Sequence, residues 1–130
     1  MEIVITDWAL DSYLDLLHAG VFTRAEYWAT LRPDVVRLRA FPNDPVFGNQ
    51  KFWSPAAIGS TAIADGFKMK WHNVGSGRVQ LRLPVGIISS AFLCAAYVKS
   101  SASAETKALI RFKQHLNLIR LGHVVRRGTL

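Results

Sequence analysis

Apolar and polar residues alternate strictly in two neighbouring stretches of the chain, Phe67–His72 and Arg78–Leu83. A period of two predicts strands whose successive side chains point to opposite faces of a sheet. Between them, Asn73–Gly77 contains two glycines and predicts a hairpin loop. Pro84 follows directly and is expected to end the second strand, because proline has no backbone donor for a ladder.

One face of this predicted hairpin is strongly basic. If the apolar side chains face the core, the other face carries Gln80 together with five cations or potential cations and no carboxylate. The five are Lys68, Lys70, His72, Arg78 and Arg82. Antiparallel sheets often leave one face in water, so a merely solvated face is the alternative interpretation. Like charges on facing strands are destabilising, however, which favours a surface that binds a polyanion.

The N-terminal residues predict a short strand followed by two helices. Glu2–Ile5 is β-branched, and Thr6 or Asp7 can cap a helix that runs to about His18. Thr23–Glu26 has the spacing of a capping box, which marks the start of a second helix. Its apolar stripe continues past Pro33, which either kinks the helix or starts a new one. We expect the two helices to form an antiparallel hairpin packed on the sheet.

The rest of the chain predicts a mixed pattern that ends in a helix. Residues 43–65 are expected to be largely irregular, and Ile87–Val98 is a continuous apolar run typical of a strand buried on both faces. Ser101 or Ser103 can cap a last helix over 104–121, and the basic tail 123–130 is expected to be flexible. The sequence therefore predicts a single α+β domain over residues 1–130: an N-terminal strand and two-helix hairpin packed on a small antiparallel sheet, with a C-terminal helix.

Charge is distributed unevenly along the 130 residues, whose formal net charge is +7. Residues 1–50 hold four Lys or Arg and seven Asp or Glu, whereas residues 51–130 hold twelve and two. A field of this kind indicates nucleic acid, an anionic membrane or an acidic protein as partner. The single cysteine, Cys94, excludes an intrachain disulfide and a multi-cysteine metal site. No signal peptide and no apolar stretch of about 18 residues is visible, so we expect a cytoplasmic protein without a membrane partner.

Three segments carry a resemblance to a known family: Gly66–Lys70, Arg78–Arg82, and the apolar strand that ends in Tyr97–Lys99 before a basic helix. With the order of the predicted elements, they resemble the RelE/ParE toxin superfamily, and the last part looks like its HigB-type branch. The resemblance covers roughly residues 66–120, and the N-terminal helices match by topology only. It implies a RelE/ParE-like fold.

The resemblance also implies the toxin of a type II toxin-antitoxin system, neutralised by a cognate acidic antitoxin protein. RelE- and HigB-like toxins cut messenger RNA on the ribosome without a metal or other cofactor, and the 2′-hydroxyl of the RNA attacks the adjacent phosphate. This chemistry needs a base for the hydroxyl, cations for the charge that develops on the phosphate, and an acid for the leaving oxygen.

The residues of the basic face are expected to fill these roles. We expect Arg82, with Arg78 beside it, to clamp the phosphate, because an Arg fork is bidentate and always charged. Lys68 or Lys70 would orient the RNA and serve as the base, with His72 as an alternative base. The resemblance carries over Tyr97 as the acid and Lys99 as a phosphate contact. Further RNA contacts are expected from Gln80, Arg111, Arg126 and Arg127. The chain is longer than typical members and lacks their C-terminal tyrosine, which leaves the identity of the acid open.

Two other functions stay open at this point. A ParE-like protein with the same fold would inhibit DNA gyrase and cut no RNA, since fold alone does not fix function. A basic nucleic-acid-binding or adaptor domain without toxicity would bind polyanions with a steep salt dependence and would not arrest growth.

Overall fold

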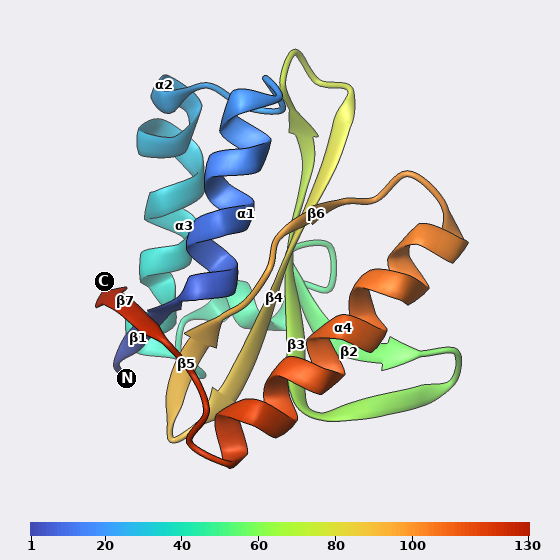
Figure 1. The fold of residues 1–130 in the computed structure, drawn as a ribbon. Coiled ribbons are helices and arrows are strands. Elements are labelled where there is room, and N and C mark those ends of the chain that lie inside the picture. Colours follow the sequence, from blue (N-terminus) through green and yellow to red (C-terminus); the bar gives the residue numbers. More distant parts are fainter.

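A computed structural model describes all residues of the chain, 1–130, and shows helices packed on one open, seven-stranded sheet (Figure 1). The strands lie in the order β2-β3-β4-β5-β1-β7, and β6 pairs with the first half of β4. β1 and β5 run parallel, and the other pairs are antiparallel. The strands are β1 (Ile3–Thr6), β2 (Trp53–Ile58), β3 (Thr61–Val74), β4 (Val79–Ile88), β5 (Ser90–Leu93), β6 (Tyr97–Val98) and β7 (Arg126–Thr129). The helices are α1 (Asp7–His18), α2 (Arg24–Glu26), α3 (Arg32–Val36) and α4 (Ala102–Arg120).

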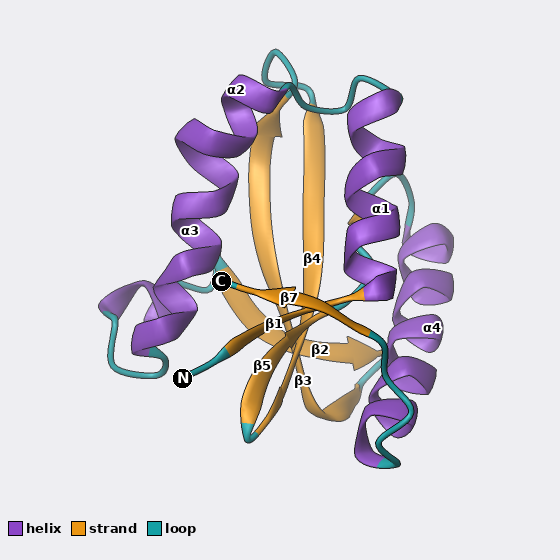
Figure 2. Ribbon diagram, turned by 60° about the vertical axis from the view of Figure 1, so that its left-hand side comes forward, coloured by secondary structure: helices purple, strands orange, loops and turns teal.

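The predicted helix starts are confirmed by their caps. The Thr6 hydroxyl accepts from the backbone N–H of Ala9 at 3.2 Å, and Thr23 and Glu26 form the reciprocal capping box. The second helix is one continuous segment, because a π-helical turn joins α2 to α3 and a 3₁₀ turn follows α3. Pro33 lies directly after the π-helical turn, and the segment continues past it because a π-helical turn is a common way to accommodate a local irregularity in a helix. Figure 2 shows α1 and this second segment alongside the long strands β3 and β4, as the expected helix hairpin requires.

Two apolar cores lie on opposite faces of the sheet. The first joins α1 and the α2–α3 segment to the sheet and contains fully buried Leu38, Met69 and Val85. The second joins α4 to the other face and contains Phe112 and Leu116. β5 contributes to both cores, because successive strand residues point to opposite faces: Leu93 enters the first core and Phe92 packs against the second.

Close contact between α4 and the sheet depends on a strand glycine. A Cβ on Gly86 would lie 2.4 Å from Cδ2 of Leu116, so any larger residue would force the buried Leu116 side chain to move. The basic face of the predicted hairpin lies on the same side of the sheet, because Gly86 and Arg82 are an even number of residues apart in β4. α4 therefore covers part of the face that the sequence pattern assigned to solvent.

Three predictions about the strands are wrong. Pro84 does not end β4; it lies within the strand and its carbonyl accepts from the N–H of Cys94. Proline is tolerated here because the backbone N–H that it lacks would point to the side of β4 where β5 has ended and β6 has not yet begun. No regular ladder of hydrogen bonds exists at that point for the proline to interrupt. The apolar run 87–98 is not one strand, because Ser89 turns the chain with a φ of 65° and the run is split among β4, β5 and β6. The hairpin turn, predicted over Asn73–Gly77, instead spans Gly75–Arg78.

The segments expected to be irregular or flexible also form strands. Within 43–65 the chain makes a short 3₁₀ turn, then β2 and the first part of β3, so this segment extends the sheet. The basic tail is not a flexible end, because β7 pairs with β1 and its two arginines bind carboxylates. The α+β class with helices packed on the sheet is confirmed, and the RelE/ParE-like topology stays a prediction. No helix is both long enough and apolar enough to cross a membrane.

Candidate functional site

Three predicted site residues form a row across three strands. In the sheet register Lys70 of β3 lies opposite Arg82 of β4, and Arg82 lies opposite Tyr97 of β6. Lys68 shares the face of Lys70, two residues earlier in β3. Lys99 follows β6 directly, and its N–H donates to the Gln80 carbonyl at 2.9 Å. We call Lys68, Lys70, Arg82, Tyr97 and Lys99 the cationic row.

Arg82 is the buried centre of this row, with 3% of its surface exposed. Its guanidinium donates to the carbonyls of Trp71 and Leu81 at 3.3 and 3.2 Å, and to the side-chain oxygen of Gln80 at 2.8 Å. The Nε of Arg82 is buried and has no hydrogen-bond partner. Burial lowers the pKa of Arg82 and the charge of Glu105 opposes that shift, but a guanidinium remains charged at neutral pH. Arg82 is therefore a fixed positive charge held by neutral oxygens.

One carboxylate, Glu105 in the first turn of α4, reaches the row. The Tyr97 hydroxyl donates to Oε2 of Glu105 at 2.7 Å, and the Lys68 ammonium lies 3.5 Å from Oε1. The side chains of Lys68 and Glu105 are only 16% and 15% exposed. Four cations thus share a single acidic side chain, and the site keeps an excess of positive charge.

No role was predicted for Glu105 from the sequence. A signal existed, because it is the only acidic residue after Asp65 and it follows the Ser101 cap at the start of α4. The pairing itself depends on how α4 docks onto the sheet, which no local pattern contains.

The surroundings shift the pKa values of three titrating groups at the site. Burial, followed by the charges of Lys68 and Arg82, lowers the pKa of Lys70. Burial, followed by the hydrogen bond to Glu105, raises the pKa of Tyr97 well above its ordinary value. Burial alone would raise the pKa of Glu105, but the hydrogen bond from Tyr97 and the nearby cations lower it below its usual value. The pKa of Lys70 is therefore below its ordinary value, although its ammonium also donates to the Gln50 carbonyl at 2.7 Å, and Tyr97 stays protonated.

Several predicted site residues lie outside the row. His72 is exposed, and its Nε2 lies 2.6 Å from the carbonyl of Lys51. Arg78 is exposed in the hairpin turn, so it does not stand beside Arg82 as the predicted clamp requires. Arg111 is exposed on α4 and, with Tyr97, lines a groove between α1 and α4.

The two tail arginines are also engaged elsewhere. Arg126 contacts Glu2 at 2.6 Å and Arg127 contacts Asp7 at 2.6 Å, both on the β1–β7 side of the sheet. Their paired charges do not add to the cationic row.

Metal-binding side chains do not gather anywhere in the structure. No group of three or more His, Cys, Asp or Glu lies close enough together to hold an ion. Cys94 is fully buried under α4, and burial raises the pKa of its thiol. The groups that the fold brings together are therefore amines, a guanidinium, a phenol and one carboxylate, a set suited to binding anions and moving protons.

Comparison with protein-family models, with curated proteins and with solved structures finds no match to this chain. The resemblance to the RelE/ParE superfamily therefore stays a prediction from the sequence, and the cationic row is the structural basis for a proposed function.

Proposed function

We propose that this protein is a toxin that cleaves messenger RNA on the ribosome by attack of the RNA 2′-hydroxyl on the adjacent phosphate. The observation that carries the proposal is the row Lys70–Arg82–Tyr97 across three paired strands, flanked by Lys68 and Lys99. An amine with a lowered pKa, a fixed guanidinium charge and a protonated phenol are the three kinds of group that this reaction uses.

Glu105 supports the proposed position of the phosphate. Its carboxylate accepts from Tyr97 and faces Lys68, so this is a place where the fold stabilises anionic oxygens. A phosphate oxygen that replaced the carboxylate would meet the same two donors. Charge-assisted hydrogen bonds of this kind are the stronger ones in proteins.

In the proposed reaction Lys70, as the neutral amine, removes the proton from the 2′-hydroxyl. The bond from the 2′-oxygen to phosphorus forms while the bond from phosphorus to the 5′-oxygen breaks. Tyr97 gives its proton to the leaving 5′-oxygen. The products are a 2′,3′-cyclic phosphate and a 5′-hydroxyl, and no further reactant is needed.

Because Arg82 is buried, its proposed role differs from the direct phosphate clamp expected from the sequence. It acts as a permanent positive charge behind the phosphate, because its fork is already bound to Gln80 and two carbonyls. Direct phosphate contacts fall to Lys68 and to exposed Lys99. An acidic antitoxin would neutralise this face by charge complementarity, and action on ribosome-bound message would place the protein in the cytoplasm.

The test is inducible expression in bacteria, with growth measured and message 5′ ends mapped. The control variant is Lys107→Gln, which changes an exposed lysine of α4. Both wild type and this control should arrest growth and create new 5′ ends in the messages. Lys70→Gln should do neither while folding normally. Arrest with intact messages would instead favour gyrase as the target. Harmless wild-type protein would overturn the toxin proposal.

A further inference from the structure

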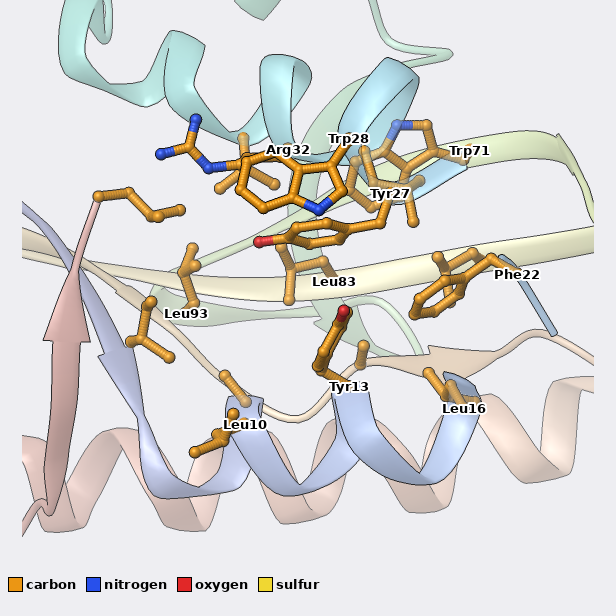
Figure 3. A pocket seen from close by; sticks show the side chains of 17 residues that line it. Leu10, Tyr13, Leu16, Phe22, Tyr27, Trp28, Arg32, Trp71, Leu83 and Leu93 are labelled. Carbon is orange, nitrogen blue, oxygen red and sulfur yellow. The ribbon is translucent and has the colours of Figure 1, made fainter. Parts of the chain in front are cut away.

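A second candidate site lies on the opposite side of the sheet from the cationic row. A cavity of about 340 Å³ opens between α1 and the α2–α3 segment, above β4 and β5 (Figure 3). Sixteen of the seventeen residues that line this cavity are hydrophobic. Protein cores are normally close-packed, and a hollow of this volume falls within the range of small-molecule sites.

The one charged residue at this cavity is Arg32, at the start of α3. It makes no ion pair, and its guanidinium carbon lies 5.2 Å from the ring centre of Trp28. Trp28 is itself 63% exposed, which is unusual for so large an apolar side chain. An arginine without a carboxylate at the edge of an apolar hollow is a ready partner for an anionic head group.

Two tyrosines give the cavity polar groups in its interior. Tyr13 rises from α1 and Tyr27 projects from the facing helical segment, so that both rings enter the cavity (Figure 3). Their ring centres lie 4.9 Å apart, and neither hydroxyl has a hydrogen-bond partner within the protein. Burial raises the pKa of Tyr27, and the charge of Tyr13 adds to the shift while Arg32 opposes it. Tyr27 is therefore protonated at neutral pH, and its hydroxyl is available as a donor.

We propose that this cavity binds a small amphipathic carboxylic acid, whose apolar body fills the hollow and whose carboxylate meets Arg32 and the tyrosine hydroxyls. The apolar wall selects a hydrocarbon or aromatic body, because burial of such surface drives binding. The unpaired guanidinium selects an acid over a neutral alcohol of the same shape. The concave form and modest volume favour a small molecule over a partner helix, which would need a long groove. The site shares no residue with the cationic row, so it is independent of the proposed nuclease function.

The test is equilibrium binding of decanoate and of decanol to the full chain, followed by tryptophan fluorescence, because Trp28 and Trp71 both line the cavity. Wild type should bind decanoate saturably. Arg32→Gln should weaken decanoate binding about tenfold and leave decanol binding within about twofold, as loss of one charged contact predicts. Arg39→Gln is the matched control, since Arg39 is exposed on the same helical segment and lies outside the cavity.

A second variant tests the hollow itself. Ala96 lines the cavity, and Ala96→Leu should fill part of it and abolish decanoate binding without loss of the folded state. The proposal is overturned if neither probe saturates, if decanol binds as tightly as decanoate, or if Arg32→Gln lowers both affinities equally. It is also overturned if the chain self-associates and buries Trp28 without ligand, because the occupant would then be a second copy. Retention of decanoate binding by Lys70→Gln would show that this site and the nuclease site are separate.

Discussion

Glu105, the single carboxylate that reaches the cationic row, gives the sharpest prediction, because its removal should change stability and RNA binding in opposite directions. Glu105→Gln keeps the shape of the side chain and an oxygen that can accept from Tyr97. The main effect of the substitution is therefore the loss of one negative charge near Lys68, Lys99 and Arg82. The folded protein should become less stable, and the same site should bind a phosphate chain more tightly.

The magnitude follows from the contact with Lys68. At 3.5 Å, and with the effective dielectric constant of about 20 that suits partly buried pairs, the attraction is about 5 kcal/mol. Desolvation of two side chains that are only 16% and 15% exposed cancels much of this gain. The loss on Glu105→Gln should be about 1 to 3 kcal/mol, because it leaves cations without their compensating charge.

Urea unfolding of wild type, Glu105→Gln and the control Glu2→Gln measures this loss. Glu2 pairs with Arg126 at 2.6 Å, but both side chains are 50% exposed, so its change should cost less than about 1 kcal/mol. Binding of a short single-stranded RNA should become about fivefold tighter in Glu105→Gln, which corresponds to about 1 kcal/mol for one unit charge near a phosphate in water. The reasoning is refuted if Glu105→Gln is as stable as wild type, or if its RNA affinity falls.

Two further predictions concern α4. Burial, followed by the charge of Arg111, lowers the pKa of His115 to about 4, so the neutral ring is the form that the folded state prefers. Stability should fall by about 1 to 2 kcal/mol as the pH drops from 6.5 towards 4, since the unfolded state binds the proton more readily. His115→Phe, which can keep the stacking on Trp8 at 3.8 Å, should remove that loss in pH-dependent unfolding. Gly86→Ala should cost about 1 to 3 kcal/mol, because its Cβ would lie 2.4 Å from the buried Leu116 side chain.

The His115 and Gly86 predictions each have a control variant. The pH dependence should survive in His123→Phe, which changes an exposed histidine beyond α4, and a flat profile for wild type would contradict the account. Gly48→Ala should be nearly neutral in the same unfolding experiment, since a Cβ there meets open space. If Gly86→Ala were as stable as wild type, that result would contradict the close packing of Leu116 in α4 against Gly86 in β4.

Local patterns predicted those parts of the fold that local chemistry controls. The Thr6 and Thr23 caps start helices where expected, because a hydroxyl satisfies a nearby N–H whatever the rest of the chain does. The alternation in β3 and β4 correctly placed Lys68, Lys70 and Arg82 on one face, because the pleat fixes the side-chain direction.

Contacts between distant segments were beyond such reasoning. β7 pairs with β1 across nearly the whole chain, and the Arg127–Asp7 contact belongs to that pairing. The position of Glu105 beside Lys68 and Tyr97 follows from the docking of α4 on the sheet. The unpaired Arg32 of the apolar cavity looked like any surface arginine in the sequence, because its significance depends on the hollow beside it.

The most direct test of the central claim is the chemistry of the RNA ends. Purified wild type and Tyr97→Phe would be incubated with ribosomes programmed with a defined message, and the products analysed for their terminal groups. Wild type should produce 2′,3′-cyclic phosphate and 5′-hydroxyl ends, and cleavage should be strongly reduced in Tyr97→Phe, which lacks only the proposed acid. Intact message, 5′-phosphate ends, or equal cleavage by Tyr97→Phe would contradict the central claim.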